Sequence, residues 1–235
     1  MHKSSSEKRW EKVMQKEAEE LALKNTDYYK ELKARICGYL AGDGCITISK
    51  ANKNSDVNCY EILFYPDDVK MAEAFVFAFK EIYGKEIIIK KDYDYDMFRL
   101  AKRAKTASLD LLSMANFGTY NWRVPANFLA TDKMKIEWLK AFFDCEAHVQ
   151  KNGIIVVQSV NKNGLEDVRK LLAGFGINSK MYKYVRKQKN WSINYLLHVL
   201  RKDAVKKYFD TVNFYHGRKK AKLASFFNAE VAEPG

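Results

Sequence analysis

Two carboxylates stand at matching places in two similar stretches of this 235-residue chain. Residues 36–44 read ICGYLAGDG and residues 139–147 read LKAFFDCEA, so each stretch is an apolar helical segment that ends in an acid, Asp43 or Glu146. A carboxylate at a helix C-terminus faces the negative end of the helix dipole and is disfavoured there. Two such groups together would repel unless a cation lay between them, and oxygen ligands favour Mg²⁺. The sequence therefore predicts one metal-dependent active site assembled from two halves.

Small residues lie four positions apart on one face of each predicted helix. They are Gly38 and Gly42 in the first stretch, and Ala141 and Cys145 in the second. Small side chains let a second backbone approach closely. We therefore expect the two helices to pack on each other and to bring the two acids together at their C-terminal ends. A single Asp-Gly pair after an apolar run is usually a plain helix end, but two matched copies favour a functional site.

The two stretches resemble the motifs of the LAGLIDADG homing endonucleases, in the single-chain form that carries two motif copies. The resemblance covers roughly residues 30–227 and extends to the sequence WRVP at 122–125 and FYHGRKK at 214–220. In that family the eighth motif position is the metal-binding acid, and it falls on Asp43 and Glu146. The resemblance thus implies a metal site at these two acids together with the residues that precede them, Gly42 and Cys145.

The chain departs from the family motif at two positions. Ala41 replaces the acid at the sixth position of the first copy, and Ala147 replaces the final glycine of the second copy. The sixth-position acid is generally structural in the family. A positive φ at Ala147 would cost about 1 kcal/mol, so we expect either strain at this residue or a different helix ending.

The resemblance implies a site-specific, intron-encoded endonuclease that hydrolyses both strands of duplex DNA across the minor groove and leaves short 3′ overhangs. It implies two or more Mg²⁺ ions, for which Mn²⁺ would substitute, and a monomer that binds a target of roughly 20 base pairs. A basic residue would polarise the attacking water: Arg123 in the first half, and Lys219 or Lys220 in the second. Asn161 and Tyr65 are predicted to position water.

Other functions remain open at this point. One is a cleavage-inactive nucleic-acid-binding relative such as an RNA maturase, which the two retained acids disfavour and Ala147 leaves open. Another is a transcription regulator of the same fold, which would typically lose the acids. A domain hosted by an intein is a third; we expect a free-standing protein, because no nucleophilic Cys or Ser splice block and no terminal His-Asn pair is evident in the sequence.

The charge balance is strongly basic, with 41 Lys and Arg against 29 Asp and Glu, a formal net charge of +12. Such a balance is typical of nucleic-acid binding, although anionic membrane surfaces attract it too. No apolar run approaches the roughly 18 residues that span a bilayer, and the N-terminus lacks a signal core. We expect a soluble, cytoplasmic protein whose cysteines are reduced, because Cys37, Cys45, Cys59 and Cys145 show no Cys-x-x-Cys spacing.

The apolar pattern predicts the same order of elements twice, which makes a pseudo-symmetric α+β protein of two αββαββα repeats with antiparallel, saddle-shaped sheets. In the first half we expect a motif helix capped by Thr26, strands 45–49 and 57–65, a helix from Pro66 to Tyr83, strands 86–91 and 97–103, and helix 105–114. In the second we expect a motif helix capped by Thr131, strands 148–150 and 154–159, helix 163–173, strands 180–186 and 191–199, and helices from Lys202 and over 218–227. The expected domains are a charged helical extension 1–25, halves 26–125 and 126–228, and a tail 229–235.

Curved antiparallel sheets can lie in the major groove, where each base pair shows a distinct pattern of donors and acceptors. Polar strand residues are therefore the predicted DNA contacts, of which we expect about half to touch DNA: Thr47, Ser49, Arg99, Arg103, His148, Gln150, Gln158, Lys183, Arg186 and Asn194. Tyr93, Tyr95, Tyr182 and Tyr184 are predicted to lie in the core or to pack on the sheets rather than to contact bases. Scattered lysines would supply the salt-dependent phosphate contacts.

Overall fold

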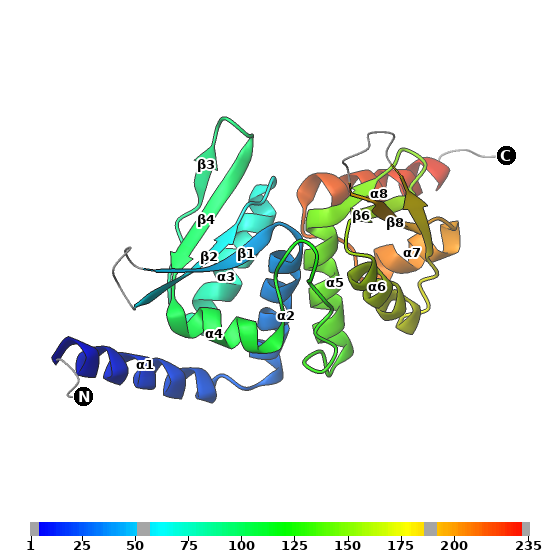
Figure 1. The fold of residues 1–235 in the computed structure, drawn as a ribbon. Coiled ribbons are helices and arrows are strands. Elements are labelled where there is room, and N and C mark those ends of the chain that lie inside the picture. The colour runs from blue at the N-terminus through cyan, green and yellow to red at the C-terminus, as the bar shows by residue number, and fades with distance from the viewer. Residues whose placement is uncertain (1–4, 51–56, 186–191, 232–235) are drawn as a thin grey trace.

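Two similar α+β halves lie side by side, with one long helix of each half next to the other at the centre of the molecule (Figure 1). The computed structural model describes residues 5–50, 57–185 and 192–231. The first half consists of α2 (Asp27–Gly42), β1 (Gly44–Lys50), β2 (Asn58–Phe64), α3 (Val69–Tyr83), β3 (Lys90–Asp92), β4 (Met97–Arg103) and α4 (Lys105–Met114). The second consists of α5 (Asp132–Glu146), β5 (Ala147–Val149), β6 (Ile155–Ser159), α6 (Lys162–Gly174), β7 (Lys180–Tyr184), β8 (Asn194–Val199), α7 (Lys202–Thr211) and α8 (Gly217–Val231).

The two halves share one sheet topology. The strand order is β1-β2-β4-β3 in the first sheet and β5-β6-β8-β7 in the second, and every paired neighbour is antiparallel. The predicted α+β repeat is therefore confirmed, with α8 as an added helix. The domain boundaries at 25, 125 and 228 stay predictions.

Capping side chains set the start of some helices, whereas Thr26, at the predicted cap position of α2, makes no side-chain capping hydrogen bond. Thr131 accepts a hydrogen bond from the Met134 N–H and caps α5, as predicted. In the first half Asp68 caps α3 by accepting from the Lys70 N–H at 2.8 Å, so this helix begins at Val69 and not at Pro66. The prediction placed Pro66 in the first turn; a capping carboxylate two residues later sets the start instead.

Some strands are shorter than the sequence pattern predicts. β3 covers Lys90–Asp92 rather than residues 86–91, because β4 pairs only with these three residues. β7 covers Lys180–Tyr184 and β8 covers Asn194–Val199, so the predicted strands are too long at Val185, Ser192 and Ile193. Arg186 and Trp191 lie outside the described residues.

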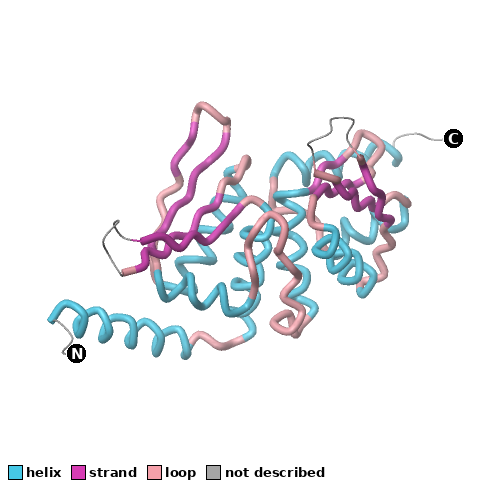
Figure 2. Tube along the Cα trace, viewed as in Figure 1, coloured by secondary structure: helices cyan, strands magenta, loops and turns pink. Residues whose placement is uncertain are grey.

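Each sheet buries one face against its own helices. In Figure 2 the strands of both halves gather above most of the helices. The first core stacks Phe64 of β2 on Phe75 of α3, with ring centroids 4.8 Å apart, and Tyr39 of α2 lies against both rings. The second core stacks Trp138 on Phe142, both of α5. The motif helices therefore belong to the cores that carry the sheets.

Helix α1 (Ser5–Leu23) is an addition on the first half, at the end of the molecule away from the C-terminal ends of α2 and α5 (Figure 1). Glu17 holds it to the body through Lys85 at 2.6 Å and through the Thr106 hydroxyl at 2.6 Å. Across the described residues, no helix has the length and apolar character needed to cross a membrane.

Candidate active site

Helices α2 and α5 cross at very close range. A Cβ built on Gly38 would overlap the Trp138 carbonyl oxygen and lie 2.9 Å from the Ala141 Cβ. A Cβ on Gly42 would overlap the Cys145 Cβ. Backbones this close tolerate only small residues at the crossing. The packing predicted from the spacing of small residues is therefore what the structure shows.

Because the two helices pack in this way, their C-terminal ends meet on the strand side of the molecule (Figure 1). Asp43 follows α2 as its C-cap, and Glu146 is the last residue of α5. Asp43 is open to solvent and Glu146 is half-buried. The two predicted acids therefore share one surface at the seam between the halves.

The second motif ends without strain. Ala147 adopts φ −86° and ψ 142° and enters β5 directly, so the left-handed conformation that would penalise a side chain does not occur there. Gly44, the matching residue of the first motif, does not have a positive φ either. Gly44 is needed for space, because a Cβ would lie 2.6 Å from Leu40 Cδ2. Of the two outcomes predicted for Ala147, a different helix ending is the one observed.

The two acids influence each other electrostatically. Loss of surrounding water, with the negative charge of Asp43 as the next cause, raises the pKa of Glu146 to about 7. Loss of water also raises the pKa of Asp43, although that carboxylate reaches solvent, while Cys145 and the positive charge of Lys219 oppose the rise. Lys219 is therefore a basic residue whose charge reaches both acids.

Lys219 caps the C-terminal end of α5. Its Nζ donates hydrogen bonds to the carbonyl oxygens of Asp144 and Cys145, the latter at 3.2 Å. An ammonium at this position offsets the negative end of the helix dipole. Of its three N–H groups, two are used in this way, and a third is left for a neighbouring group. The structure thus brings the predicted Lys219 to the acids.

Asp144, the sixth residue of the second motif, anchors the chain that leads into α8. It is fully buried, and its carboxylate accepts hydrogen bonds from the Tyr39 hydroxyl at 3.1 Å and from the backbone N–H groups of Tyr215 and His216 at 3.0 Å. Burial raises its pKa to about 7 in spite of these donors. Ala41 stands at the matching position of the first motif and makes no such anchor.

The other basic residues predicted for catalysis lie elsewhere. Arg123 is held by Asp167 of α6 through two hydrogen bonds of 2.5 and 3.0 Å. Lys220 is exposed, and its charge acts on Lys140. Neither Arg123 nor Lys220 is among the charges that shift the pKa of the two motif acids.

The two predicted water-positioning residues differ in their surroundings. Tyr65 lies opposite Asp43, since its backbone N–H donates to the Asp43 carbonyl oxygen at 3.1 Å. Asn161 is buried, and both ends of its amide are engaged: it accepts from the Gly164 N–H at 3.0 Å and donates to the Trp122 carbonyl at 2.6 Å. Asn161 therefore caps α6 and binds the linker, a structural role in place of the predicted one of positioning water. The strand register pairs Ala147 with Val157, so Gln158 follows directly after this pair while Glu146 directly precedes it.

A cavity of about 220 Å³ adjoins Glu146, and Lys219 is not among its lining residues. Its lining includes Gly118 and Thr119 of the linker 115–131, which joins α4 to α5, and Ser159 at the end of β6. Ala41 and Gly42 of α2 also line it. Glu146 therefore borders an open space as well as the charge of Lys219.

A divalent cation fits these residues. The donors are carboxylate and backbone carbonyl oxygens, which suit Mg²⁺, and two neighbouring acids with raised pKa values lack a full counter-charge. In the described part of the chain no group of three His, Cys, Asp or Glu side chains could hold a metal by itself. Asp43 and Glu146 would thus hold the ion together with the carbonyl of Gly42, and remaining positions would fall to water or a phosphate. Cys145 was predicted in the same role, but its carbonyl oxygen accepts from Lys219.

The outer face of the first sheet carries the DNA contacts predicted for that half. Cross-strand pairs place Thr47 opposite Glu61, Glu61 opposite Arg103, and Lys90 opposite Arg99. Because side chains alternate along strands, these residues share one face with Ser49, and Ile62 and Leu100 fill the other face. The four predicted residues of this half therefore lie together, on the side opposite the core.

The second sheet divides its predicted residues between two faces. His148, Gln150 and Gln158 alternate onto the outer face. Lys183 pairs with Tyr195 and shares its face with the buried Leu197, so it points to the opposite side. The outer face of β7 carries other residues instead, namely Lys180, Tyr182 and Tyr184.

Two more predicted residues differ from expectation. Asn194 is buried at 7% exposure and accepts a hydrogen bond from the Gln158 amide at 3.2 Å, so it orients Gln158. Arg186 lies outside the described residues. Tyr93 and Tyr95 are 85% and 72% exposed, so the prediction that they pack in the core or on a sheet is wrong. Tyr182 and Tyr184 are 43% and 50% exposed on the outer sheet face, where the Tyr182 ring packs against His198 with centroids 4.9 Å apart, as predicted for sheet packing. The alternation of side chains along β7 could have shown from the sequence that Tyr182 and Tyr184 share one face.

The raised pKa of Glu146 predicts a pH-dependent stability. The pKa is about 7 in the folded protein against 4.5 for an ordinary glutamate, so the folded chain binds this proton more tightly than the unfolded chain. Stability is therefore lost as pH rises from 4.5 to 7, and the full loss applies above 7. We expect Glu146→Gln to raise the thermal midpoint of the metal-free protein by several degrees at pH 8 and hardly at pH 4.5. Calorimetry at both pH values, with Glu20→Gln on the exposed side of α1 as control, tests this; an equal shift at both would contradict it.

Comparisons with known proteins agree with this geometry. The model of a family described as LAGLIDADG-like domain matches residues 133–213, which contain most of α5 and the second sheet. Replication factor C small subunit of Methanocaldococcus jannaschii is 28% identical over 208 residues, which cover 87% of this chain and 10% of that protein. The chain thus spans about a tenth of the length of this curated relative.

Solved structures share the whole architecture. Variants of the homing endonuclease I-DmoI match with a TM-score of 0.63 and 17% identity, over 84% of this chain and 98% of theirs. I-DmoI in complex with DNA and Mn matches with 0.61 and 17%, over 78% and 97%. The N-terminal LAGLIDADG domain of DUF199/WhiA matches with 0.52 and 13%, over 85% and 89%. The chain is therefore a single-chain protein of the LAGLIDADG fold with two motif copies, as its repeated sequence stretches predict.

Proposed function

We propose that this protein is a site-specific, metal-dependent endonuclease for duplex DNA, of the intron-encoded homing type. The observation that carries the proposal is the pair of acids, Asp43 and Glu146, at the joined ends of two helices that also carry two polar-faced sheets. I-DmoI, which has the same fold, is described in complexes with DNA and Mn and with DNA and Ca. Both acids lie in one chain, so a monomer would suffice for both strands.

The outer sheet faces would read the target. Thr47, Arg99 and Arg103 in one half, and His148 and Gln158 in the other, present hydrogen-bonding groups on the side opposite the cores. Such side chains distinguish base pairs in the major groove. The net charge of +12 supports additional phosphate contacts, which supply affinity that falls with salt.

The reaction adds water across one phosphodiester bond of each strand. The water oxygen bonds to phosphorus, the bond from phosphorus to O3′ breaks, and protons pass from the water to solvent and from solvent to O3′, which leaves a 5′-phosphate and a 3′-hydroxyl. Asp43 and Glu146 would hold Mg²⁺, which when bound supplies Lewis-acid stabilisation of the charge that develops on the phosphate. Lys219 would use its remaining N–H to polarise the water or a phosphate oxygen.

The direct test is cleavage of a plasmid that carries the uninterrupted host junction, with Mg²⁺ or with EDTA. We expect linear product with short 3′ overhangs in Mg²⁺ only, and specific binding in both. Binding without cleavage would overturn the endonuclease and support a binding-only protein such as a maturase or a regulator. Cleavage of unrelated plasmid at the same rate would overturn site specificity.

The strand register predicts which residues of the second sheet matter for recognition. Gln158 lies on the outer face and Lys183 on the opposite one. We expect Gln158→Ala to weaken specific binding by about 1–3 kcal/mol, and Lys183→Ala to leave the difference between specific and nonspecific affinity nearly unchanged. Competition binding against an unrelated duplex measures this difference, and a larger loss in Lys183→Ala than in Gln158→Ala would contradict the assignment of faces.

A further inference from the structure

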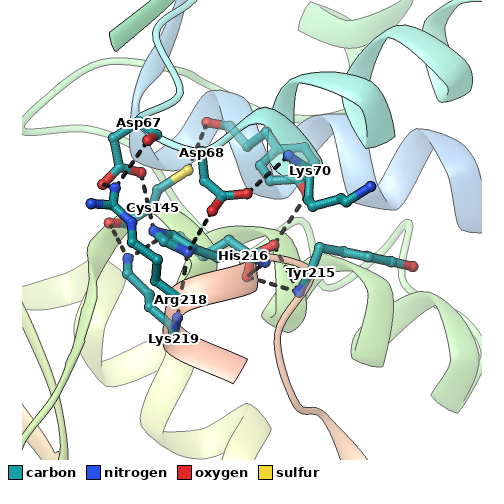
Figure 3. A network of polar contacts seen from close by, with 10 residues as sticks. Asp67, Asp68, Lys70, Cys145, Tyr215, His216, Arg218 and Lys219 are labelled. Atoms are coloured by element: carbon teal, nitrogen blue, oxygen red, sulfur yellow. Dashed lines mark hydrogen bonds and ion pairs between the residues drawn. The ribbon is translucent and has the colours of Figure 1, made fainter. Parts of the chain in front are cut away.

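A group of ionisable residues joins the start of α8 to the start of α3 across the seam between the halves (Figure 3). His216 is 2% exposed, and its two ring nitrogens each lie 3.3 Å from a carboxylate: Nε2 from Asp67 and Nδ1 from Asp68. Arg218 donates to the Asp67 carbonyl oxygen at 3.0 Å and lies 3.3 Å from its carboxylate. We name these four residues the cross-half clasp. Hydrogen bonding from His216 contributes most to a lowered pKa of Asp67.

The clasp and the active site share one helical turn. His216 directly precedes α8, and its Nδ1 accepts a hydrogen bond from the Lys219 backbone N–H at 3.4 Å, so the ring is tied to the base of the Lys219 side chain. Asp144 holds the backbone of this turn from the second half. Asp67 and Asp68 hold its side chains from the first half. Lys219 itself ends at the α5 carbonyls beside both acids.

In the other half of the repeat, the residue that matches Asp68 is uncharged. Asp68 and Asn161 are matching residues, because each caps the helix that follows the second strand of its half. Asn161 also ties the two halves together, with a hydrogen bond to the Trp122 carbonyl. In that half a neutral amide suffices to hold the linker, and a cavity adjoins the acid. The carboxylate, Asp68, occurs in the half whose side chains contact the turn that carries Lys219.

We propose that Asp68 and His216 are positioning residues that hold Lys219 in place at the acid pair. The consequence for catalysis rests on the proposed endonuclease function, whereas the consequence for the lysine itself does not. The first half of the chain thereby sets the position of a basic group that belongs to the second half.

The first experiment measures the lysine directly, by limited acetylation and peptide mass spectrometry. Asp68→Asn keeps the α3 cap, because asparagine caps helices as well as aspartate does, and His216→Gln keeps a hydrogen-bonding side chain. In the unchanged protein we expect half-buried Lys219 to react more slowly than exposed Lys220 and Lys222.

Both substitutions should raise the acetylation rate of Lys219 about threefold or more while Lys220 and Lys222 stay the same, since a released amine regains solvent and rotamer freedom. The matched control is Asp203→Asn, at the exposed start of α7, where the carboxylate contacts Arg201. Thermal midpoints confirm that each variant is folded. An unchanged Lys219 rate in both folded variants would overturn the proposal, and so would an equal rise at all three lysines.

The second experiment asks whether the clasp acts through Lys219. We expect Asp68→Asn to lower kcat about tenfold with little change in KM, and to have no further effect when Lys219→Met is already present. Independent contributions would instead multiply, and that result would overturn the proposal. If the unchanged protein does not cleave its host junction, the endonuclease proposal fails, and the acetylation result still decides whether Asp68 and His216 position the lysine.

Discussion

Asp43→Asn and Glu146→Gln are each expected to abolish double-strand cleavage while the protein still binds its target about as tightly as before. Each substitution removes one of two acids that share a single site, so the cation and the scissile phosphates lose a common ligand. Binding is spared because the bases contact the outer sheet faces, and because removal of a negative charge beside phosphates relieves repulsion. Gel shift and plasmid cleavage on the same preparations measure the two properties.

The size of the loss in kcat distinguishes a metal ligand from a residue that takes no part in catalysis. Removal of a group that acts in the transition state lowers kcat by orders of magnitude, whereas a remote change leaves it within a few-fold. Asp203→Asn, a surface carboxylate of α7, serves as the matched control. If either motif variant cleaves within a few-fold of the unchanged protein, the assignment of that acid as a metal ligand is wrong.

The parts of the fold that follow from local pattern could be predicted from the sequence. Small residues four apart in each motif indicate a close helix crossing, and the structure has Gly38 and Gly42 against Ala141 and Cys145. Capping residues such as Thr131 mark helix starts. These features depend on neighbours within one or two turns, which the sequence displays directly.

Features that depend on strand register could be predicted only in part. Lys183 lies on a predicted strand, but which face it takes depends on its pairing with Tyr195, and a one-residue difference reverses the face. Likewise Asn161 resembles a polar group available to water, yet its amide is consumed by a helix cap and by the Trp122 carbonyl. A buried side-chain amide is generally hydrogen-bonded within the protein, and these bonds give Asn161 a structural role.

The cross-half clasp could not be predicted by pattern at all. Arg218 and Asp67 are 151 residues apart, and only the packing of the two halves brings them together. The sequence does show His216, Arg218 and Lys219 as one basic run, but not which of them faces the other half and which faces the acids. Helical geometry divides them: Lys219 reaches α5, and His216 and Arg218 reach the start of α3.

Gly42→Leu is expected to damage both stability and catalysis, because Gly42 lies where the two motif helices touch. Even a single Cβ there would overlap the Cys145 Cβ and lie 2.9 Å from its Sγ. A leucine must therefore push the backbones apart. Overpacking of this kind costs about 1–3 kcal/mol. A displacement of one ångström at the acids would lower the cleavage rate roughly a hundred-fold.

At an exposed helix position, leucine in place of glycine would raise stability, because leucine is the better helix former. Leucine in place of alanine would change stability little, because the two have similar helix propensities. Ala18→Leu on exposed α1 is the control, and its thermal midpoint and cleavage rate should stay near those of the unchanged protein. The thermal midpoint and the rate are measured for both variants on the same target. A Gly42→Leu protein as stable and as active as Ala18→Leu would mean that the helices do not need this contact. The acids would then not depend on the α2–α5 crossing for their approach, and a single active site formed by that crossing would have to be abandoned.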